Sequence, residues 1–387
     1  MELVTRDKCF SCGACISICP HHAISAEQKD GFSYPMIDRN LCVNCGLCKR
    51  ACPAENYRKS EQNPNLYAFR HTDRNLVEKS SSGAAFTALS DHILAQGGLV
   101  IGAVMDEDHV VRHHLTDSVS VRDSMRGAKY VQSDLNGTFE ATKKAFKNGE
   151  KPLLFIGTPC QAEAFRTYCT AAGLDLKKII ICALVCHGAS SPLIWKQWVE
   201  TFLRERTGNN LEICFRNKEQ GWRNNKMTAF VDGKPYSMQS YANLFYSNLC
   251  NQKACFSCPF TTPMRNCDIT LGDFWSIQRF DAGFAEGNGV SMLLSHTEKG
   301  DKLIRQCAVD GDLRQLAFDP AAESLQPALT KPYEKPVEYE QFWKDYQKLN
   351  FQRLVRKYTG KSRADRIRRV LRRKMLKILQ ASGVIQN

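Results

Sequence analysis

The sequence predicts a multidomain protein of the α+β or α/β class, with a small cysteine-rich module, a two-part mixed α/β body and a basic C-terminal helix. Eight cysteines in the first 52 residues form an internal repeat with a period of 33 residues. Units of strand, loop and helix follow one another between residues 99 and 188, which is typical of a parallel or mixed sheet with helices on its faces. With 387 residues the chain is too long for one compact unit. We expect four parts: residues 1–58, 65–150, 151–330 and 331–387.

Each half of the cysteine repeat reads C-x2-C-x2-C-x3-C-P, which is the bacterial spacing for the ligands of 4Fe-4S clusters. In proteins with two clusters, the fourth cysteine of each run ligates the other cluster. The predicted ligand sets are Cys9, Cys12, Cys15 and Cys52 for one cluster, and Cys42, Cys45, Cys48 and Cys19 for the second. Zinc sites or a disulfide scaffold are the alternatives, but zinc ligands usually come as separated C-x2-C pairs. Residues 1 to about 58 resemble a two-cluster bacterial-type ferredoxin domain.

The composition is that of an ordinary globular protein, with 43% hydrophobic and 24% charged residues. The longest apolar run, Ile179 to Cys186, is far shorter than the roughly 18 residues that a membrane helix needs. The cysteine repeat begins at Cys9, which leaves no room for a signal peptide. We therefore expect a cytoplasmic protein in a reducing compartment, whose 18 cysteines are ligands or free thiols rather than disulfides.

A polar link at residues 58–64 separates the cysteine repeat from the body. Leu66 to Phe69 is predicted as a strand, and the serines of Lys79 to Gly83 precede an alanine-rich helix that ends at Gly97 and Gly98. Serines at this place are typical N-caps, but a helix start can also bind a phosphate, and both interpretations stay open. Leu99 to Met105 is predicted as the next buried strand.

Two loops stand at the ends of predicted strands. The run 153–156 ends at Gly157-Thr158-Pro159-Cys160-Gln161, and the run 179–185 ends at Cys186-His187-Gly188. Ligands in such sheets bind at the carboxyl ends of the strands, so the two loops should face one site. The chain contains no G-x-G-x-x-G, G-x4-G-K-S/T, H-E-x-x-H or G-x-S-x-G pattern. Nucleotide hydrolysis, zinc proteolysis and serine esterase chemistry therefore have no support.

Three stretches together resemble the coenzyme F420 hydrogenase/dehydrogenase beta-subunit family, here with a fused N-terminal ferredoxin. They are Arg126-Gly127-Ala128-Lys129-Tyr130, the loop 157–161, and the pair Cys255 and Cys258 followed by Asp268 to Trp275. The resemblance runs from about Leu66 to Leu316 and implies an N-terminal-like part at 65–150 and a C-terminal-like part at 151–330. It also implies bound FAD, a further 4Fe-4S cluster and hydride exchange with a deazaflavin such as coenzyme F420. The family more usually has serine where this chain has Ala128, which takes Ala128 out of the predicted ligands.

The candidate site residues come from these loops. Four cysteines on three loops are predicted to ligate a third 4Fe-4S cluster, with a zinc site that uses Cys250 or Cys267, or free thiols, as the alternatives. The third cluster would use Cys160, Cys186, Cys255 and Cys258. The predicted FAD-binding residues are Ser82, Gly83, Arg126, Lys129, Tyr130, Gly157, Thr158, Gln161 and Asp273. His187 is the candidate catalytic residue, against a purely structural role.

These features predict a flavin- and iron-sulfur-dependent oxidoreductase that passes electrons between a one-electron carrier protein, or a subunit of a redox complex, and a small hydride-carrying substrate such as coenzyme F420. Clusters move one electron and hydride carriers move two, so a chain that joins them needs a flavin, which can do both. One alternative is a ferredoxin-dependent reductase of an organic substrate such as a glycan precursor. The other is an electron-relay subunit without a substrate site.

The C-terminal tail carries most of the net charge of +13, because residues 351–387 contain 12 Lys or Arg against Asp365 alone. Between Arg353 and Lys377 a helix is predicted with one apolar face, formed by Ile367, Val370, Leu371, Met375 and Ile378. This helix is expected to pack on the body, to lie on an anionic membrane at its inner face, or to contact an acidic redox partner. Nucleic acid is not expected as a partner, and a homo-oligomer stays open.

Overall fold

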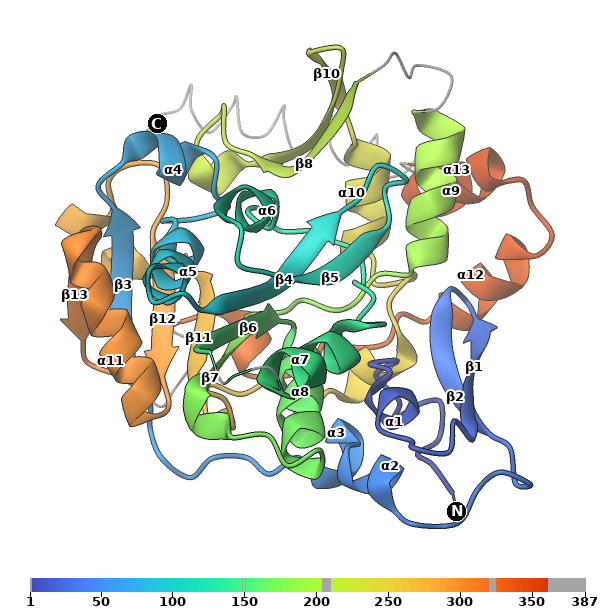
Figure 1. Cartoon of the computed structure of the whole chain (residues 1–387). Coiled ribbons are helices and arrows are strands. Elements are labelled where there is room, and N and C mark those ends of the chain that lie inside the picture. Colours follow the sequence, from blue (N-terminus) through green and yellow to red (C-terminus); the bar gives the residue numbers. More distant parts are fainter. Residues whose placement is uncertain (1, 148, 150, 204–209, 320–324, 361–387) are drawn as a thin grey trace.

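The computed structural model describes residues 2–147, 149, 151–203, 210–319 and 325–360. Its centre is a mixed eight-stranded sheet with the order β13-β3-β12-β11-β7-β6-β4-β5 (Figure 1). The neighbours β11, β7, β6 and β4 are parallel, whereas the strands at both edges pair antiparallel. The strands are β3 (Asn65–His71), β4 (Leu99–Met105), β5 (Val111–Thr116), β6 (Leu153–Gly157), β7 (Ile179–Leu184), β11 (Ile269–Asp273), β12 (Ser291–Ser295) and β13 (Gly311–Leu316). The predicted mixed α/β class is confirmed.

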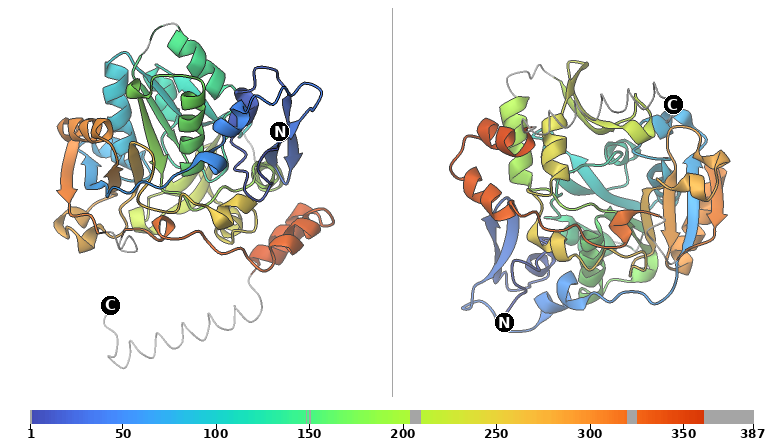
Figure 2. Two further views of the ribbon diagram at one scale, coloured as in Figure 1. Left: turned by 90° about the horizontal axis from the view of Figure 1, so that it is seen from below. Right: turned by 180° about the vertical axis from the view of Figure 1, so that it is seen from behind.

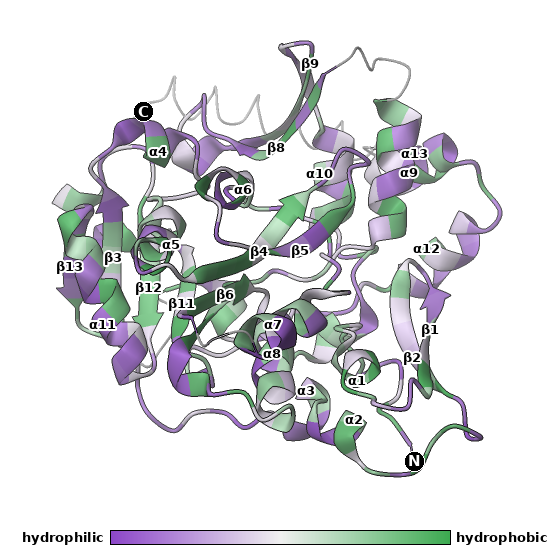
Figure 3. Cartoon of the chain, viewed as in Figure 1, coloured by the Kyte–Doolittle hydropathy of each residue, from purple (hydrophilic) through white to green (hydrophobic). Residues whose placement is uncertain are grey.

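Helices cover both faces of this sheet, because its central strands are apolar on both sides (Figure 3). On one face, α5 (Ala85–Ala95) and α11 (Glu298–Gln306) pack on alternate residues such as Val100, Leu154 and Ile180. On the other face, α7 (Thr138–Lys147) and α8 (Pro159–Ala171) pack on Ile101, Phe155 and Ile181. The short helices α4 (Arg74–Glu78) and α6 (Val119–Ser124) lie in connections between strands.

The N-terminal module is small and lies against one side of the body (Figure 2). Its hairpin pairs β1 (Ile24–Lys29) with β2 (Phe32–Ile37), and its short helices are α1 (Ala14–Ser17), α2 (Leu47–Arg50) and α3 (Pro53–Asn56). Two glutamines of the body hold the first cysteine loop, because Gln132 donates to the Phe10 carbonyl at 3.0 Å and Gln252 to the Cys9 carbonyl at 2.8 Å. Thr167 of α8 donates to the Ala51 carbonyl at 2.8 Å. The module is thus bonded to the body at several points.

The turn of the N-terminal hairpin fits closely against the body at Gly31. A Cβ atom there would lie 2.4 Å from Ser191 Oγ and 2.6 Å from Leu193 Cβ, and the φ angle is +82°. We expect Gly31→Ala to lower the free energy of unfolding by about 1 kcal/mol for the left-handed backbone and by a further 1–3 kcal/mol for the clash. Gly97→Ala is the matched control, since Gly97 has φ +69° and nothing within 4 Å of the added Cβ. Urea unfolding of both variants measures the difference, and equal losses would show that the contact at Gly31 is not rigid.

A second, smaller sheet and a helical layer complete the body. The sheet has the order β10-β9-β8 and consists of β8 (Leu211–Asn217), β9 (Lys226–Val231) and β10 (Lys234–Ser237). The helices α9 (Pro192–Phe202), α10 (Gln239–Tyr246), α12 (Tyr339–Tyr346) and α13 (Phe351–Thr359) share one hydrophobic core with this sheet. The segment before α12 runs behind the central sheet to reach these helices (Figure 2). The eight strands of the central sheet come from residues 65–316. The predicted domain boundary at residue 150 falls between α7 and β6 and therefore divides this sheet.

The beginning of the predicted basic tail packs on the body, because Leu354 and Val355 of α13 are buried. The rest of the predicted amphipathic helix, including Ile367 and Ile378, lies outside the described residues. None of the described helices has the length and apolar character needed to cross a bilayer.

Candidate redox site

Two cavities in the N-terminal module are each lined by four cysteines. One is lined by Cys9, Cys12, Cys15 and Cys52, and the other by Cys19, Cys42, Cys45 and Cys48. Each set combines three cysteines of one run with the fourth cysteine of the other, which is the arrangement that the spacing predicts. Burial, together with a charge on Cys52, raises the pKa of the Cys9 thiol to about 11. Such thiols become thiolates readily only when a metal centre takes up their charge.

A third group of cysteines lies where the body meets the module. Cys160 is in the first turn of α8, Cys186 follows β7, and Cys255 and Cys258 lie in and after the short helix η4 (Lys253–Ser257). Burial, together with charges on Cys258 and Cys186, raises the pKa of Cys160 to about 12. The pKa of Cys255 is raised by burial and by charges on Cys186, Cys160 and Cys258. The four thiols are therefore close neighbours, and each of these cysteines is partly buried.

The spacing of these four thiols does not favour a single zinc ion. Two sulfurs on one Zn²⁺ lie at most about 4.6 Å apart, since each Zn–S bond is about 2.3 Å. Within the described part of the chain, the only three His, Cys, Asp or Glu side chains with all ligand atoms within 4.8 Å are His92, Cys307 and Asp310. The alternative zinc ligands are engaged elsewhere: Cys250 contacts Ser190 Oγ at 3.2 Å, and Cys267 donates to the Ile269 carbonyl at 3.4 Å.

A buried arginine accompanies the third group of cysteines. Arg265 is 3% exposed and donates to the carbonyls of Phe260, Thr262 and Leu184 at 2.9–3.1 Å. Burial lowers its pKa, while charges on Cys267, Cys258 and Cys186 raise it. Its cation lies where it would offset part of the negative charge of a thiolate-ligated centre. The sequence offered one signal for this role, the place of Arg265 seven residues after Cys258, but that signal is weak.

The largest of these three cavities lies at the carboxyl ends of the parallel strands, as expected for this class of sheet. It holds about 240 Å³ of space that the centres of water molecules can reach. Eight of the nine predicted FAD-binding residues line it: Ser82, Arg126, Lys129, Tyr130, Gly157, Thr158, Gln161 and Asp273. The ninth, Gly83, lies next to Ser82 and packs so closely that a Cβ there would be 2.3 Å from the Phe69 carbonyl oxygen. The structure thus brings the predicted residues together around one space.

The serines before α5 do not cap this helix, which corrects one of the two interpretations of this stretch. The N-cap is Ala84, with φ 65° and no side-chain cap bond. Ser291 of β12 instead accepts from the Gly83 N–H at 3.0 Å and the Ala85 N–H at 3.4 Å. Ser82 donates to the Val290 carbonyl at 2.6 Å. Sequence reasoning missed Ser291 because it lies more than 200 residues away in the chain.

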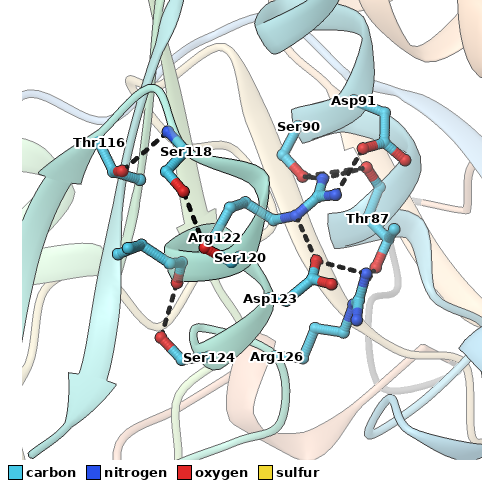
Figure 4. A network of polar contacts seen from close by, with 11 residues as sticks. Thr87, Ser90, Asp91, Thr116, Ser118, Ser120, Arg122, Asp123, Ser124 and Arg126 are labelled. Carbon is cyan, nitrogen blue, oxygen red and sulfur yellow. Dashed lines mark hydrogen bonds and ion pairs between the residues drawn. The ribbon is translucent and has the colours of Figure 1, made fainter.

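The two cations among the predicted FAD-binding residues, Arg126 and Lys129, already have partners in the protein. Arg126 forms an ion pair with Asp123 at 2.5 Å and donates to Thr87 Oγ1 at 3.0 Å (Figure 4). Asp123 also accepts from Arg122, a buried arginine that ties α6 to α5 through Asp91. The ammonium of Lys129 donates to three carbonyls, of Ser124, Met125 and Arg126, at 2.8–3.0 Å. Burial lowers the pKa of Lys129 to about 7, whereas these three carbonyls favour its charged form.

Arg216 is the lining cation with free hydrogen-bonding capacity, and sequence reasoning missed it. It lies on β8, is 8% exposed, and its Nη1 donates to Asp273 Oδ2. Its Nε and Nη2 are buried without a hydrogen-bond partner among the described residues. Burial disfavours its charge, but Asp273 and then Tyr130 raise its pKa overall. The guanidinium also stands over the Trp275 ring at 4.8 Å, which fixes its plane.

A buried histidine, His113, offers a hydrogen-bond acceptor to the same cavity. His113 Nε2 is 3.0 Å from the Ile156 carbonyl and therefore carries the proton of the neutral ring. Burial lowers the pKa of His113 to about 4, so the ring is neutral at pH 7. Its Nδ1 is then an acceptor, and it has no hydrogen-bond partner among the residues that the structure describes. The cavity thus offers unused donors on Arg216 and an unused acceptor on His113.

One side chain connects the cavity to the third group of cysteines. Thr158 lines the cavity, and its Oγ1 lies 3.3 Å from Cys160 Sγ. It is also the N-cap of α8 and binds Gln161 Oε1 at 2.9 Å, while Gln161 Nε2 donates to Ser133. The predicted residues Thr158 and Gln161 therefore fix the start of α8 between the two places.

His187 does not line the cavity. Its ring packs against Tyr333 at 4.0 Å and Phe245 at 5.1 Å, beside Cys186. Burial lowers its pKa, and its Nε2 has no hydrogen-bond partner in the described part of the chain. The catalytic role of His187 stays a prediction that this geometry does not favour, since the ring does not line the cavity.

Two family models match parts of the chain. Residues 150–320 match the family that describes the C terminus of the beta subunit of coenzyme F420 hydrogenase/dehydrogenase, and residues 8–56 match the 4Fe-4S dicluster domain. No curated protein matches the chain significantly. Among solved structures, a chain of the xenon-derivatised F420-reducing NiFe hydrogenase complex from Methanosarcina barkeri has 17% sequence identity and a TM-score of 0.46, covering 69% of this chain and 84% of that chain. The predicted resemblance is confirmed by the two family matches.

Proposed function

We propose that this iron-sulfur redox protein, which is related to the coenzyme F420 hydrogenase beta subunit, is an FAD-dependent oxidoreductase. It would link a one-electron carrier to a two-electron hydride substrate. The observation that carries this proposal is the order of four places in the structure. Two cysteine-lined cavities in the module, a third group of four partly buried thiols, and the largest cavity follow one another. FAD, when bound, exchanges single electrons with clusters and hydride with organic carriers.

The contacts between these places support one path for electrons. Helix α1, which carries Cys15, contacts helix α2, which carries Cys48, so the two cavities of the module are adjacent. Phe10, the residue after Cys9, lies 5.2 Å from the ring of Phe260, and Cys160 and Cys258 pack on the same apolar group. Thr158 then reaches from Cys160 to the cavity. In this proposal electrons cross the module, the third cluster and the cavity in that order, or in reverse.

The lining of the largest cavity fits a flavin dinucleotide. The buried donors of Arg216 suit an anionic or carbonyl oxygen, and the acceptor Nδ1 of His113 suits an N–H group. The backbone of residues 80–85 at the start of α5 and of Gly127 to Lys129 lines the same space, where N–H groups can meet a phosphate. Leu184, Val185 and Leu271 supply apolar surface for a ring system. A second, hydride-carrying molecule such as coenzyme F420 would have to reach this space from solvent.

The proposal predicts that anaerobically purified protein releases FAD on acid precipitation, at about one per chain, because hydrogen bonds and apolar contacts in the cavity would hold it. The released flavin is identified by chromatography against FAD, FMN and riboflavin standards. Reduced coenzyme F420 is then expected to bleach the flavin absorbance without a protein partner. Release of FMN, or of no flavin, would contradict the proposal, and bleaching by a reduced carrier protein alone would point to an organic substrate other than a deazaflavin.

A further inference from the structure

The second cluster site of the module, which Cys19, Cys42, Cys45 and Cys48 line, has an exposed surface of its own. Of its four cysteines, Cys45 is exposed, and Leu41 and Val43 on either side of Cys42 are 51% and 57% exposed. The segment that carries them joins β2 to α2 at the edge of the molecule, away from the central sheet (Figure 1). We define the distal surface as the exposed residues Arg39, Leu41, Val43, Cys45, Lys49 and Arg50.

The distal surface is positively charged around its apolar centre. In residues 36–50, Arg39, Lys49 and Arg50 stand against a single carboxylate, Asp38. Among the described residues, the ion pairs of the module are Arg6 with Glu27 and Asp7 with Lys253. The three cations are thus exposed and lack a carboxylate partner within the described structure. Apolar contacts framed by charges are the usual anatomy of a protein docking site.

We propose that the distal surface docks an acidic one-electron carrier protein. The inference rests on the proposed function only in taking the second site of the module as a loaded cluster. The body bonds to the module through Gln132, Gln252 and, next to Arg50, Thr167. Cys45 is exposed, so a partner can reach it without displacing these contacts. Leu41 and Val43 would exclude water beside the cluster, and the cations would steer an acidic partner to it.

The same cations have a second possible effect, which the test must separate from docking. A cluster ligated by thiolates is anionic, so Lys49 and Arg50 also offset its charge. An effect on the cluster changes its reduction by every donor. Steering changes only the reaction with an acidic protein, and it weakens as salt screens the charges.

The test uses the full-length, iron-loaded protein with the charges reversed in Lys49→Glu and Arg50→Glu together. The probe is an acidic flavodoxin in its fully reduced form, and stopped-flow absorbance follows its oxidation to the semiquinone. We expect the second-order rate constant to fall about 10-fold or more at low salt and the difference to shrink at high salt. The control is Lys234→Glu with Lys302→Glu, an equal charge change on β10 and α11, for which we expect no loss.

Reduced methyl viologen, a small cationic donor, gives the second comparison, and with it we expect no loss of rate. Equal rates for the two double variants with flavodoxin would overturn the proposal. A matching loss with methyl viologen would also overturn it, because the cations then act on the cluster itself. If the reversal variant loses iron, Lys49→Gln with Arg50→Gln replaces it, with about half the effect on the logarithm of the rate. Flavin content does not enter the readout, so a failure of the proposed FAD chemistry is seen separately.

Discussion

If the proposed third 4Fe-4S cluster is present, replacing Cys258 by serine is expected to lower the iron content from about 12 to about 8 atoms per chain, since that cluster would lose a ligand while the two of the module would keep theirs. Reduction of the flavin by a one-electron donor should slow by orders of magnitude, because Cys160 and Cys258 lie between the module and the cavity. The rate at which a hydride donor reduces the flavin should be unchanged. Iron and zinc analysis together with stopped-flow absorbance under anaerobic conditions measure both effects.

Cys250→Ser is the matched control for this experiment. Cys250 is also buried and lies five residues before Cys255, but its thiol contacts Ser190 and the Leu244 carbonyl instead of the third group. We expect this variant to keep about 12 iron atoms. Loss of zinc in Cys258→Ser with iron constant at about 8 would show that the third site holds zinc, and unchanged iron would show that Cys258 is not a ligand.

Replacing Arg216 by glutamine is expected to weaken FAD binding about 100-fold. Two charge-assisted hydrogen bonds from the unused Nε and Nη2 contribute about 1.5 kcal/mol each, and 1.4 kcal/mol corresponds to a tenfold change in the dissociation constant. If these donors meet a phosphate, riboflavin binding should change little, and if they meet the ring, FAD and riboflavin binding should fall together. Quenching of flavin fluorescence measures both ligands.

Arg126→Gln is the comparison for Arg216, because Arg126 lines the same cavity but its guanidinium is already paired with Asp123. We expect a loss well below that of Arg216→Gln. An equally large loss of FAD affinity in Arg126→Gln would contradict the role assigned to the unused donors of Arg216. Since Arg216→Gln also leaves Asp273 without its cation, urea unfolding of the variant without flavin separates a loss of stability from a loss of binding.

Local patterns in the sequence predicted much of the fold. Leu99 to Met105 is the strand that its apolar run indicates, and the glycines at 97 and 98 follow the end of α5. The loop at the end of β6 lines the cavity together with Leu184 and Val185 at the end of β7, because parallel strands end at a common edge. The predicted loop of Cys186, His187 and Gly188 does not line it. These predictions succeeded because period, turn chemistry and strand direction are properties of short segments.

The contacts that complete the site were out of reach for the same reason. Ser291 caps α5 and Arg216 pairs with Asp273 through folding alone, across 206 and 57 residues of chain. Lys129 sits in a basic motif that suggests a phosphate ligand, yet it ends up closing the last turn of α6. Arg216 keeps buried donors without a partner in the described structure, whereas the Lys129 ammonium is fully engaged by carbonyls. This difference depends on burial and on partners, and neither is visible in a linear pattern.

The central eight-stranded sheet determines which parts of this chain can be exchanged as units. The part that matches the beta-subunit family begins at residue 150, but cutting there removes β3, β4 and β5. β6 and β12 would then become open edges, and β13 would lose β3, the only strand with which it pairs in the described structure. Open apolar edges invite aggregation. The polar link after residue 58 carries no strand pairing, so recombination that adds or removes the N-terminal module there leaves the sheet whole.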